Sequence, residues 1–204
     1  MARYGMLIDT TKCIGCYACR TACQRQNDLL PAESFIKFHE FERGTYPHVT
    51  IEHVPTQCMH CVDAPCQAVC PTGATYTTED GIVCVDHGRC IGCKYCMAAC
   101  PYQVRYQVES GEVQKCTFCH HRTSVGLLPA CVGTCVGYAR TFGDLNDPES
   151  DIAKRLAEAD GGDVLYEDLG LNPSLYYIGL KETEAMPVAS AIHRGGNVMK
   201  PYEG

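Results

Sequence analysis

Short apolar runs predict strands in the first half of the chain. Residues 4–9 and 82–86 each form such a run, and each run precedes a group of closely spaced cysteines. Between them, residues 35–41 and 49–54 alternate in polarity around Gly44-Thr45-Tyr46-Pro47. Alternation on both sides of a segment that contains Gly and Pro is typical of two paired strands, so we predict a hairpin insertion here.

A turn and a helix are predicted further along the chain. Gly111 is expected in a turn between residues 104–108 and Val113. Asp147-Pro148-Glu149 has the residue types of a helix N-cap, a first-turn proline and a first-turn acid. Apolar residues at helical spacing follow: Ile152, Leu156 and Ala159. We therefore predict a helix that begins after Asp147 and ends before Gly161-Gly162.

The end of the chain carries one more strand signal and then loses its pattern. Residues 175–180 are mostly apolar and predict a strand. Residues 181–204 show little periodicity. They are expected to form either a mobile terminus or an arm that orders against a partner subunit.

Composition changes this picture, because 17 of the 204 residues are Cys. The chain has no Trp and five Phe, so aromatic side chains add little to a core. A chain this rich in Cys is a disulfide scaffold, a zinc protein or an iron–sulfur protein. The formal net charge of −7 and the lack of a basic stripe argue against a nucleic-acid partner. No apolar run approaches the roughly 20 residues of a spanning helix, so we expect no membrane span. The apolar start of the chain is short and soon meets Asp9, so we expect no signal peptide.

Sixteen of the cysteines fall into four sets of four. The sets are Cys13, Cys16, Cys19 and Cys23; Cys58, Cys61, Cys66 and Cys70; Cys90, Cys93, Cys96 and Cys100; and Cys116, Cys119, Cys131 and Cys135. Sets one and three have the Cys-x2-Cys-x2-Cys-x3-Cys spacing of bacterial ferredoxins. Such short spacings curl the backbone so that amide N–H groups point at the cluster sulfurs. Gly15 and Gly92 are expected to supply the positive φ of this curl.

Other uses of these cysteines fit the spacing less well. Cysteines in a Cys-x2-Cys-x2-Cys run are poorly placed for several mutual disulfides. Zinc ribbons use pairs and need no third Cys at this spacing. A mixed case, in which one set binds another cluster type or zinc, stays open; set four is where we expect it, because its gap of eleven residues is irregular. Cys84, the remaining cysteine, lies in an apolar run and is expected to be a buried core residue.

The fourth cysteine of each ferredoxin run binds the neighbouring cluster in two-cluster ferredoxins, which predicts how the sets pair. Pairing the adjacent sets two and three, and then sets one and four, predicts four ligand quartets, which we name A to D. Quartet A is Cys13, Cys16, Cys19 and Cys135; quartet B is Cys23, Cys116, Cys119 and Cys131; quartet C is Cys58, Cys61, Cys66 and Cys100; quartet D is Cys70, Cys90, Cys93 and Cys96. Pairing set one with set two is the topological alternative. The predicted cofactors are four 4Fe–4S clusters, with iron bound by these sixteen cysteines.

Cations and histidines lie next to the cysteine sets in the sequence and are candidates to affect the clusters. Cations flank the sets at five positions: Lys12, Arg20, Arg89, Lys94 and Lys115. A nearby positive charge raises the potential of a cluster, and we expect this of Lys115, with solvated surface as the alternative for each cation. The histidines beside the sets are expected to form hydrogen bonds or to be exposed, rather than to bind iron: His60, His87, His120 and His121. No arrangement suited to proton transfer or nucleophilic attack stands out, so we expect no catalytic residue.

Four motifs, taken with the cysteine sets, resemble one protein family. They are Gln57-Cys58-Met59-His60-Cys61, Cys70-Pro71-Thr72-Gly73-Ala74, Lys115-Cys116-Thr117-Phe118-Cys119 and Arg140-Thr141-Phe142-Gly143-Asp144. Over residues 1–180 the chain resembles the four-cluster iron–sulfur subunits of the dimethyl-sulfoxide-reductase superfamily, among them the polysulfide reductase electron-transfer subunit. That family pairs set one with set four and set two with set three.

The resemblance implies an electron-transfer subunit of a larger oxidoreductase. Proteins of the family bind a large catalytic chain that carries molybdenum or tungsten on a bis-pterin cofactor. They relay electrons between that chain and a membrane quinone-reactive subunit or another redox partner. The resemblance also implies the periplasmic face of the membrane, reached by co-export with a partner, with the cytoplasm as the alternative. Two other functions stay open: a free-standing polyferredoxin-type carrier, and a wire subunit of a formate dehydrogenase or hydrogenase complex.

The repeats predict the fold. Residues 12–19 resemble residues 89–96, which is typical of a duplicated ferredoxin unit. We predict an α+β fold of two pseudo-symmetric ferredoxin-like modules with loop insertions. Residues 1–50 with 108–144 form the module of sets one and four, and residues 51–107 form the module of sets two and three. Residues 145–204 are expected to form a C-terminal helix and strand extension with a partner-binding tail.

Overall fold

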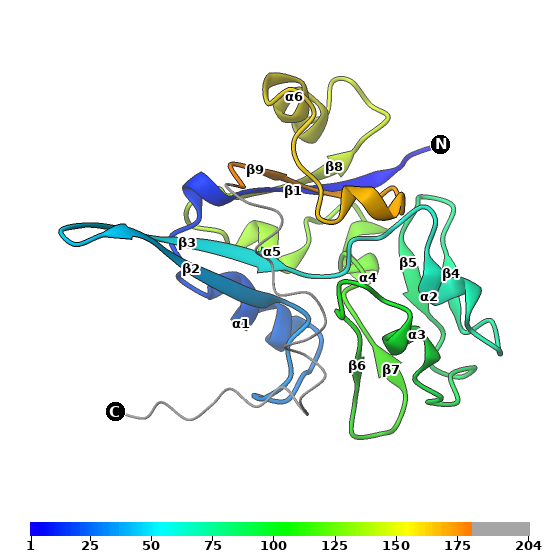
Figure 1. The fold of residues 1–204 in the computed structure, drawn as a ribbon. Helices are drawn as coiled ribbons and strands as arrows, with labels where there is room; N and C mark the ends of the chain where they lie inside the picture. Colours follow the sequence, from blue (N-terminus) through cyan, green and yellow to red (C-terminus); the bar gives the residue numbers. More distant parts are fainter. Residues whose placement is uncertain (181–204) are drawn as a thin grey trace.

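The first strand of the chain lies at the centre of a three-stranded sheet (Figure 1). The computed structural model describes residues 1–180, so the tail predicted at residues 181–204 lies outside the described residues. Strand β1 (Tyr4–Asp9) pairs antiparallel with β8 (Arg140–Asp144) and parallel with β9 (Leu175–Ile178). The sheet therefore brings the start of the chain beside the segment that follows the last cysteine.

Strand β1 is apolar because both of its faces are covered. Met6, Leu7 and Ile8 are fully buried in succession. A strand with a single buried face would alternate between apolar and polar residues, and a continuous run indicates burial on both sides. The strands predicted at residues 4–9 and 175–180 are confirmed.

The predicted hairpin is also confirmed, and it projects from the body of the protein (Figure 1). Strands β2 (Lys37–Thr45) and β3 (His48–Thr56) pair antiparallel, with Thr45 opposite His48 at the tip. The strands extend closer to the tip than the alternation of polarity indicated. Ile36 and Val54 are buried at the base, whereas Tyr46 at the tip is exposed.

Two small hairpins lie in the middle of the chain. Strand β4 (Thr75–Thr77) pairs with β5 (Val83–Val85), and β6 (Tyr106–Gln107) pairs with β7 (Val113–Gln114). Gly111 has a φ of 96° between β6 and β7, which confirms the predicted turn. Cys84 lies in β5 and is 6% exposed, so the prediction of a buried core residue is confirmed.

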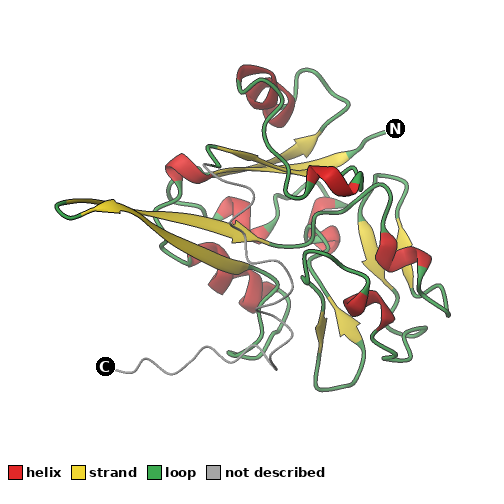
Figure 2. Cartoon of the chain, viewed as in Figure 1, coloured by secondary structure: helices red, strands yellow, loops and turns green. Residues whose placement is uncertain are grey.

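Most helices of the described chain are a single turn long (Figure 2). They are α1 (Ala18–Gln26), α2 (Pro65–Ala68), α3 (Tyr95–Ala98), α4 (His120–Thr123), α5 (Ala130–Gly133) and α6 (Asp151–Glu158), with 3₁₀ turns η1 (Thr10–Lys12) and η2 (Glu167–Leu169). No helix among residues 1–180 is both long enough and apolar enough to cross a membrane. Helices this short gain little from their own hydrogen bonds, so packing must hold them.

Helix α6 begins three residues later than predicted. Its N-cap is Ser150, whose hydroxyl oxygen accepts a hydrogen bond from the Ala153 N–H at 3.2 Å. The prediction that Asp147 caps the helix is wrong, because Asp147 closes a turn ahead of it. The Asp147 carboxylate accepts from the Glu149 N–H at 2.9 Å, and the Ser150 N–H donates to the Asp147 carbonyl at 3.0 Å. The helix ends before Gly161, as predicted.

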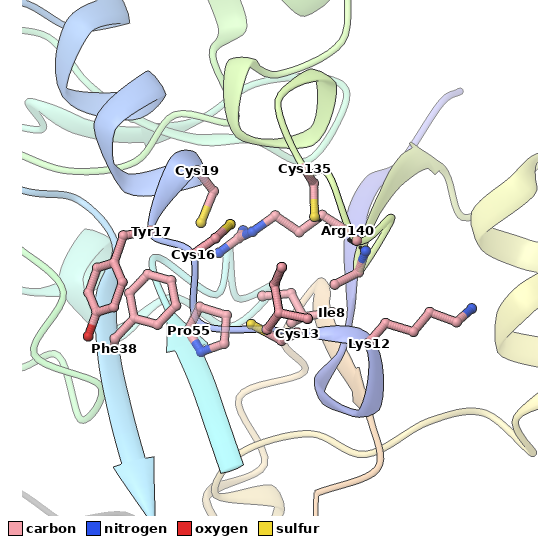
Figure 3. Close-up of a pocket in the computed structure, with 13 residues that line it drawn as sticks. Ile8, Lys12, Cys13, Cys16, Tyr17, Cys19, Phe38, Pro55, Cys135 and Arg140 are labelled. Carbon is pink, nitrogen blue, oxygen red and sulfur yellow. Dashed lines mark hydrogen bonds between the residues drawn. The ribbon is translucent and has the colours of Figure 1, made fainter. Parts of the chain in front are cut away.

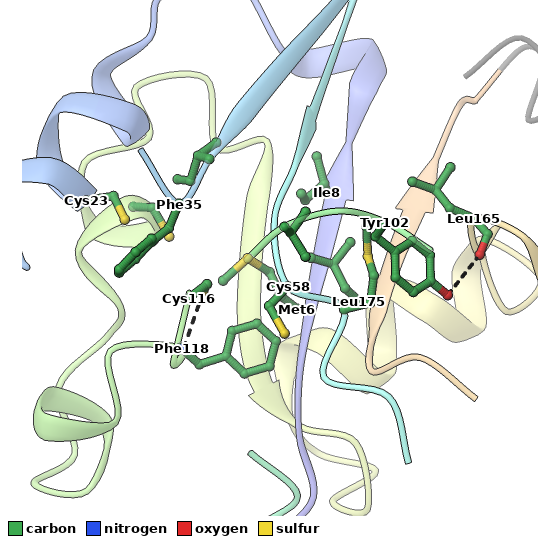
Figure 4. Close-up of a cluster of buried hydrophobic side chains, with 14 of the residues drawn as sticks. Met6, Ile8, Cys23, Phe35, Cys58, Tyr102, Cys116, Phe118, Leu165 and Leu175 are labelled. Atoms are coloured by element: carbon green, nitrogen blue, oxygen red, sulfur yellow. Dashed lines mark hydrogen bonds between the residues drawn. The ribbon is translucent and has the colours of Figure 1, made fainter. Parts of the chain in front are cut away.

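The central core combines apolar side chains with cysteines (Figure 4). Cys58 and Cys116 lie beside Met6 and Leu175 in this core. Cysteine therefore takes positions that larger apolar residues hold in other small proteins.

Candidate metal centres

The sixteen cysteines of the four sets line four separate cavities. Quartets A, B, C and D each line one cavity, with volumes of 380, 290, 340 and 320 Å³ including solvent at the mouth. The sulfurs are therefore grouped with set one beside set four and set two beside set three. Set one does not share a cavity with set two. Similar volumes and equal numbers of cysteines indicate that the four sites suit the same kind of group.

Pairs of touching helices distribute the sulfurs between neighbouring cavities. In α1, Cys19 faces quartet A, and Cys23, one turn further along, faces quartet B. Helix α5 packs against α1 and reverses this order, because Cys131 faces quartet B and Cys135, just after the helix, faces quartet A. Residues one turn apart lie on one face of a helix, so a single turn can serve two sites.

Helices α2 and α3 form the second exchanging pair. They pack against each other, and Cys66 in α2 faces quartet C, whereas Cys70, just after it, faces quartet D. Cys96 in α3 faces quartet D, and Cys100 faces quartet C. Each fourth cysteine thus lies with its partner set, in the arrangement known for two-cluster ferredoxins.

Two glycines allow the backbone to curl between the first two cysteines of sets one and three. Gly15 has a φ of 65° and Gly92 a φ of 67°, as predicted for these positions. A Cβ at Gly15 would collide with the ring of His53, and one at Gly92 would meet the carbonyl oxygen of Gly111. Both the conformation and the close packing therefore require glycine.

Backbone amides point at sulfurs in all four quartets. The N–H groups of Ala139, Phe118, Val113 and Thr75 lie 3.3, 3.4, 3.5 and 3.4 Å from the sulfurs of Cys135, Cys116, Cys90 and Cys70, in quartets A, B and D. In quartet C, the backbone N–H groups of Val104 and Tyr102 donate to Cys100. The Phe118 N–H lies within a Cys-x2-Cys run, as expected, and such donors stabilise negative charge on sulfur.

Burial keeps several of these thiols neutral as long as no metal binds them. Burial raises the pKa of Cys61 to about 12 and that of Cys131 to about 11, and it raises the pKa of Cys116 well above its ordinary value. Burial also acts on Cys70, but N–H donors from Thr75 and its neighbours outweigh it and lower the pKa of Cys70 to about 7. Ligands must be thiolates, so metal binding at the buried sites must displace protons.

The quartets differ in their depth below the surface. Every cysteine of quartets B and C is buried, whereas Cys16 of quartet A and Cys93 of quartet D are exposed. Ile14 and Ile91, which line cavities A and D, are 66% and 68% exposed. Two sites are thus interior and two reach the surface beside apolar residues.

The spread of the sulfurs suits a cluster better than a single ion. Within residues 1–180, no three His, Cys, Asp or Glu side chains converge closely enough to hold one metal ion. A zinc ion needs sulfurs about 2.3 Å from one centre. Ligands of a 4Fe–4S cluster bind separate iron atoms at its corners and are correspondingly further apart. The donor set, all cysteine, also fits the cluster.

The histidines lie where they were expected. His60 is fully buried, accepts a hydrogen bond from the Val83 N–H at 3.0 Å and stacks on Phe118 with ring centroids 3.7 Å apart. His87 lies 3.7 Å from Glu112, and His120 lies 3.9 Å from Asp80. None of these three histidines lines any of the four cavities.

Buried cations lie among the quartets, and the sequence identified one of the three. Lys115 is 2% exposed, and its ammonium donates to the carbonyl oxygens of Val83 and Cys116. Its effect on a cluster potential stays a prediction. Arg105 and Arg140 are also buried and were missed, because neither lies next to a cysteine. Each is the fifth residue after the last cysteine of its set, which is the signal that could have found them.

Two domain families match the chain, and both are described as 4Fe–4S dicluster domains. One matches residues 49–145 and the other residues 12–74. The chain is therefore an iron–sulfur protein with two dicluster ferredoxin-like domains and several 4Fe–4S clusters.

Curated relatives show the family more closely. The chain is 44% identical to the B subunit of tetrathionate reductase from Salmonella typhimurium, over 91% of this chain and 76% of that protein. It is 38% identical to a putative iron–sulfur B subunit of dimethyl sulfoxide reductase from Halobacterium salinarum, over 92% and 83% of the two chains. It is 41% identical to the B subunit of selenate reductase from Mesobacillus selenatarsenatis, over 85% and 70%. The chain belongs to the iron–sulfur electron-transfer subunits of the dimethyl-sulfoxide-reductase superfamily, which confirms the resemblance drawn from its motifs.

Proposed function

We propose that this chain binds four 4Fe–4S clusters, one at each quartet, and relays electrons through them in anaerobic respiration. The observation that carries the proposal is the division of sixteen cysteines among four similar cavities, with four sulfurs in each. When bound, each cluster supplies a site that accepts and releases one electron. The chain itself holds the sites in place, keeps water from the inner ones and stabilises their negative charge with N–H donors.

The sites follow one another in the order A, B, C, D. Helices α1 and α5 each contribute to A and B, and α2 and α3 each contribute to C and D. Gln57 joins the halves, since its amide lies 3.7 Å from the sulfur of Cys116 in quartet B and it precedes Cys58 of quartet C. Quartets A and D reach the surface, so they are the points where electrons enter and leave.

The same exchange of sulfurs supports the two proposed modules. Residues 1–50 with 108–144 carry quartets A and B, and residues 51–107 carry quartets C and D. The pairs α1 with α5 and α2 with α3 serve equivalent roles, which is the basis for proposing pseudo-symmetry. Residues 145–204 form the proposed extension, of which β9 joins the sheet of β1.

The proposed partner at one end is a large catalytic subunit that carries molybdenum or tungsten on a bis-pterin cofactor. At the other end is a membrane quinone-reactive subunit or another redox protein. The names of the relatives support this, since they are B subunits of tetrathionate, dimethyl sulfoxide and selenate reductases. We place the complex on the periplasmic face of the membrane by co-export; cell fractionation with an antibody against this chain tests that location against the cytoplasm.

An iron assay tests the cofactor content. Protein that is isolated without oxygen should hold about sixteen iron atoms and about as many acid-labile sulfides per chain. Reduction with dithionite should produce the electron paramagnetic resonance signals of reduced 4Fe–4S clusters. Far fewer iron atoms, or zinc in their place, would contradict the proposal.

Purification from the native host tests the partner. A tagged copy should co-purify with a much larger chain, in a complex that contains molybdenum or tungsten. Recovery of a fully loaded chain alone would favour a free-standing carrier instead, and a large partner without either metal would favour a hydrogenase complex.

A further inference from the structure

Two buried arginines lie between neighbouring quartets. Arg105 donates through Nη2 to the sulfur of Cys66 in quartet C at 2.9 Å, and its Nη1 lies 3.2 Å from the hydroxyl of Thr75, which lines the cavity of quartet D. Arg140 lines the cavity of quartet A, and its Nη1 lies 4.0 Å from the sulfur of Cys131 in quartet B. Figure 3 shows the Arg140 side chain reaching in among the sulfurs of quartet A. Each guanidinium thus touches one quartet and adjoins the next.

The positions of these arginines follow from the exchange of sulfurs. Arg105 is the fifth residue after Cys100, and Arg140 is the fifth after Cys135. At each of these cysteines the chain has just crossed from its own quartet to the partner quartet. The backbone then turns back, so the residue five positions later lies between the two sites. Because the same spacing occurs in both halves of the protein, chance does not explain the position of the arginines well.

Neither arginine is balanced by a carboxylate. Within residues 1–180, no Asp or Glu oxygen lies within ion-pair distance of Arg105 or Arg140. Arg140 donates through Nη1 to the Gln57 carbonyl oxygen at 2.8 Å, and Arg105 donates to the Thr75 hydroxyl at 3.2 Å. The buried Nη2 of Arg140 has no hydrogen-bond partner among the described residues. A buried cation is costly unless anions surround it, and here the neighbouring anions are cysteine sulfurs.

The surroundings of Arg140 point to the same anions. Its side chain lines the cavity that Cys19 and Cys135 of quartet A also line, and its Nη1 lies 4.0 Å from the sulfur of Cys131 in quartet B. A charge in a dry interior acts more strongly and over a longer distance than one in water.

We propose that the buried positive charges of Arg105 and Arg140 each raise the reduction potentials of two neighbouring clusters. Arg140 acts on the clusters at quartets A and B, and Arg105 acts on those at quartets C and D. The inference rests on the proposed function, since it takes a cluster to be bound at each quartet. The reduced cluster carries one more negative charge than the oxidised one, so a fixed cation nearby favours reduction. A cation shared by two clusters raises both reduction potentials, so the difference between the two potentials stays small.

Redox titration of variants of the full chain tests this inference. Arg140→Met should lower the potentials of the clusters at quartets A and B and leave those at C and D unchanged, and Arg105→Met should do the reverse. We expect at least a tenfold shift in each reduction equilibrium, which is about 59 mV for one electron. Arg→Lys variants should recover most of the shift. Titrations are followed by electron paramagnetic resonance, and signals are assigned by their loss in single Cys variants.

An exposed cation beside a quartet provides the matched control. Lys94 lines the cavity of quartet D but is exposed, so Lys94→Met should move the potential there much less than Arg105→Met does. Iron and sulfide are measured first in every sample. Unchanged potentials in fully loaded Met variants would overturn the inference and leave the proposed function intact. A wild-type chain with far fewer than about sixteen iron atoms would instead overturn the proposed function.

If a Met variant does not bind its clusters, variants with other charges keep the test decisive. Arg→Gln keeps a hydrogen-bond donor and removes the charge, so it replaces a Met variant that loses iron. If both neutral variants lose iron, the Lys variants decide. Lys variants that retain clusters and potentials near those of the wild type support the proposed charge effect. Lys variants that also lose their clusters would make the arginines structural clamps and overturn it.

Discussion

At the scale of single residues, burial alone does not decide what a cysteine does in this protein. Cys84 and Cys116 are 6% and 8% exposed, and both belong to the central core. Cys116 shares its cavity with three other cysteines and has N–H donors directed at its sulfur. Cys84 lines none of the four cavities. The difference lies in the neighbours of the sulfur.

Substitution of the two cysteines should therefore have different effects on iron content. Cys84→Ala should keep all the iron and cost about 1 kcal/mol or less, because it removes one small buried sulfur. Cys116→Ala should lose one cluster, about four iron atoms, because a ligand is missing. Iron and sulfide assays on anaerobically purified variants measure both. Equal iron losses in the two variants would contradict the separate roles.

Ionisation of the buried thiols gives a prediction about pH. Most of the ligand thiols are protonated near pH 7 when iron is absent. Burial raises the pKa of Cys61, Cys116 and Cys131 where the chain is folded, and a thiol of the unfolded chain has an ordinary pKa of about 8.5. Reconstitution with iron and sulfide must then release these protons, so its yield should rise as the pH rises from about 6.5 to about 8.5. A pH indicator in weak buffer counts the protons, and iron-free protein with alkylated thiols provides the blank. Proton release no greater than that of the blank would show that the thiols were already ionised.

At the scale of elements, the caps and turns around α6 fix the segment after the last cysteine. The Ser150 hydroxyl donates to the Asp144 carbonyl at 2.6 Å, so one side chain joins the end of β8 to the start of α6. Arg155 of α6 also pairs with Asp9 of β1 at 2.9 Å. These bonds hold α6 on the sheet and touch no quartet.

Removal of this cap should reduce stability without affecting redox chemistry. Ser150→Ala should cost about 1 kcal/mol, because the first helical turn loses its side-chain acceptor. Iron content and reduction potentials should remain those of the wild type. Thermal unfolding followed by circular dichroism measures the loss, and Ser124→Ala, at an exposed position, is the control. A midpoint no lower than that of the control would mean that the cap contributes little.

At the scale of the whole molecule, the cluster ligands replace part of a missing core. The hairpins β4–β5 and β6–β7 are two or three residues per strand, and four helices are single turns. Elements of this length are unstable on their own. Sixteen thiolates bound to metal would link residues that are far apart in the sequence, much as structural zinc does in small domains.

Removal of iron should therefore unfold most of residues 1–144. Without the clusters, the short elements lose the bonds between them, and the far-UV circular dichroism signal should fall sharply. The measurement compares chelator-treated protein with protein incubated anaerobically without chelator. Iron-free protein that retains the full signal would show that the apolar core suffices.

Local pattern was a good guide where neighbours in sequence decide the structure. The β2–β3 hairpin, the turn at Gly111 and the conformations of Gly15 and Gly92 all depend on nearby residues, and all were predicted. The cap of α6 was misplaced because Asp147 and Ser150 are both good caps, and the choice between them depends on contact with Asp144. The division into modules stays a prediction.

The sequence by itself determined the chemistry of this protein, because ligand spacing on a curled backbone is a local property. It sorted sixteen cysteines into sets, excluded Cys84 and identified the family. The tertiary structure decided what lies between the sites. Arg105 and Arg140 come between quartets because helices from distant parts of the chain exchange their last sulfurs, and no local pattern shows which cavity a side chain enters. Burial also depends on the whole fold, and the electrostatic effect of a buried charge extends further than that of a charge in water.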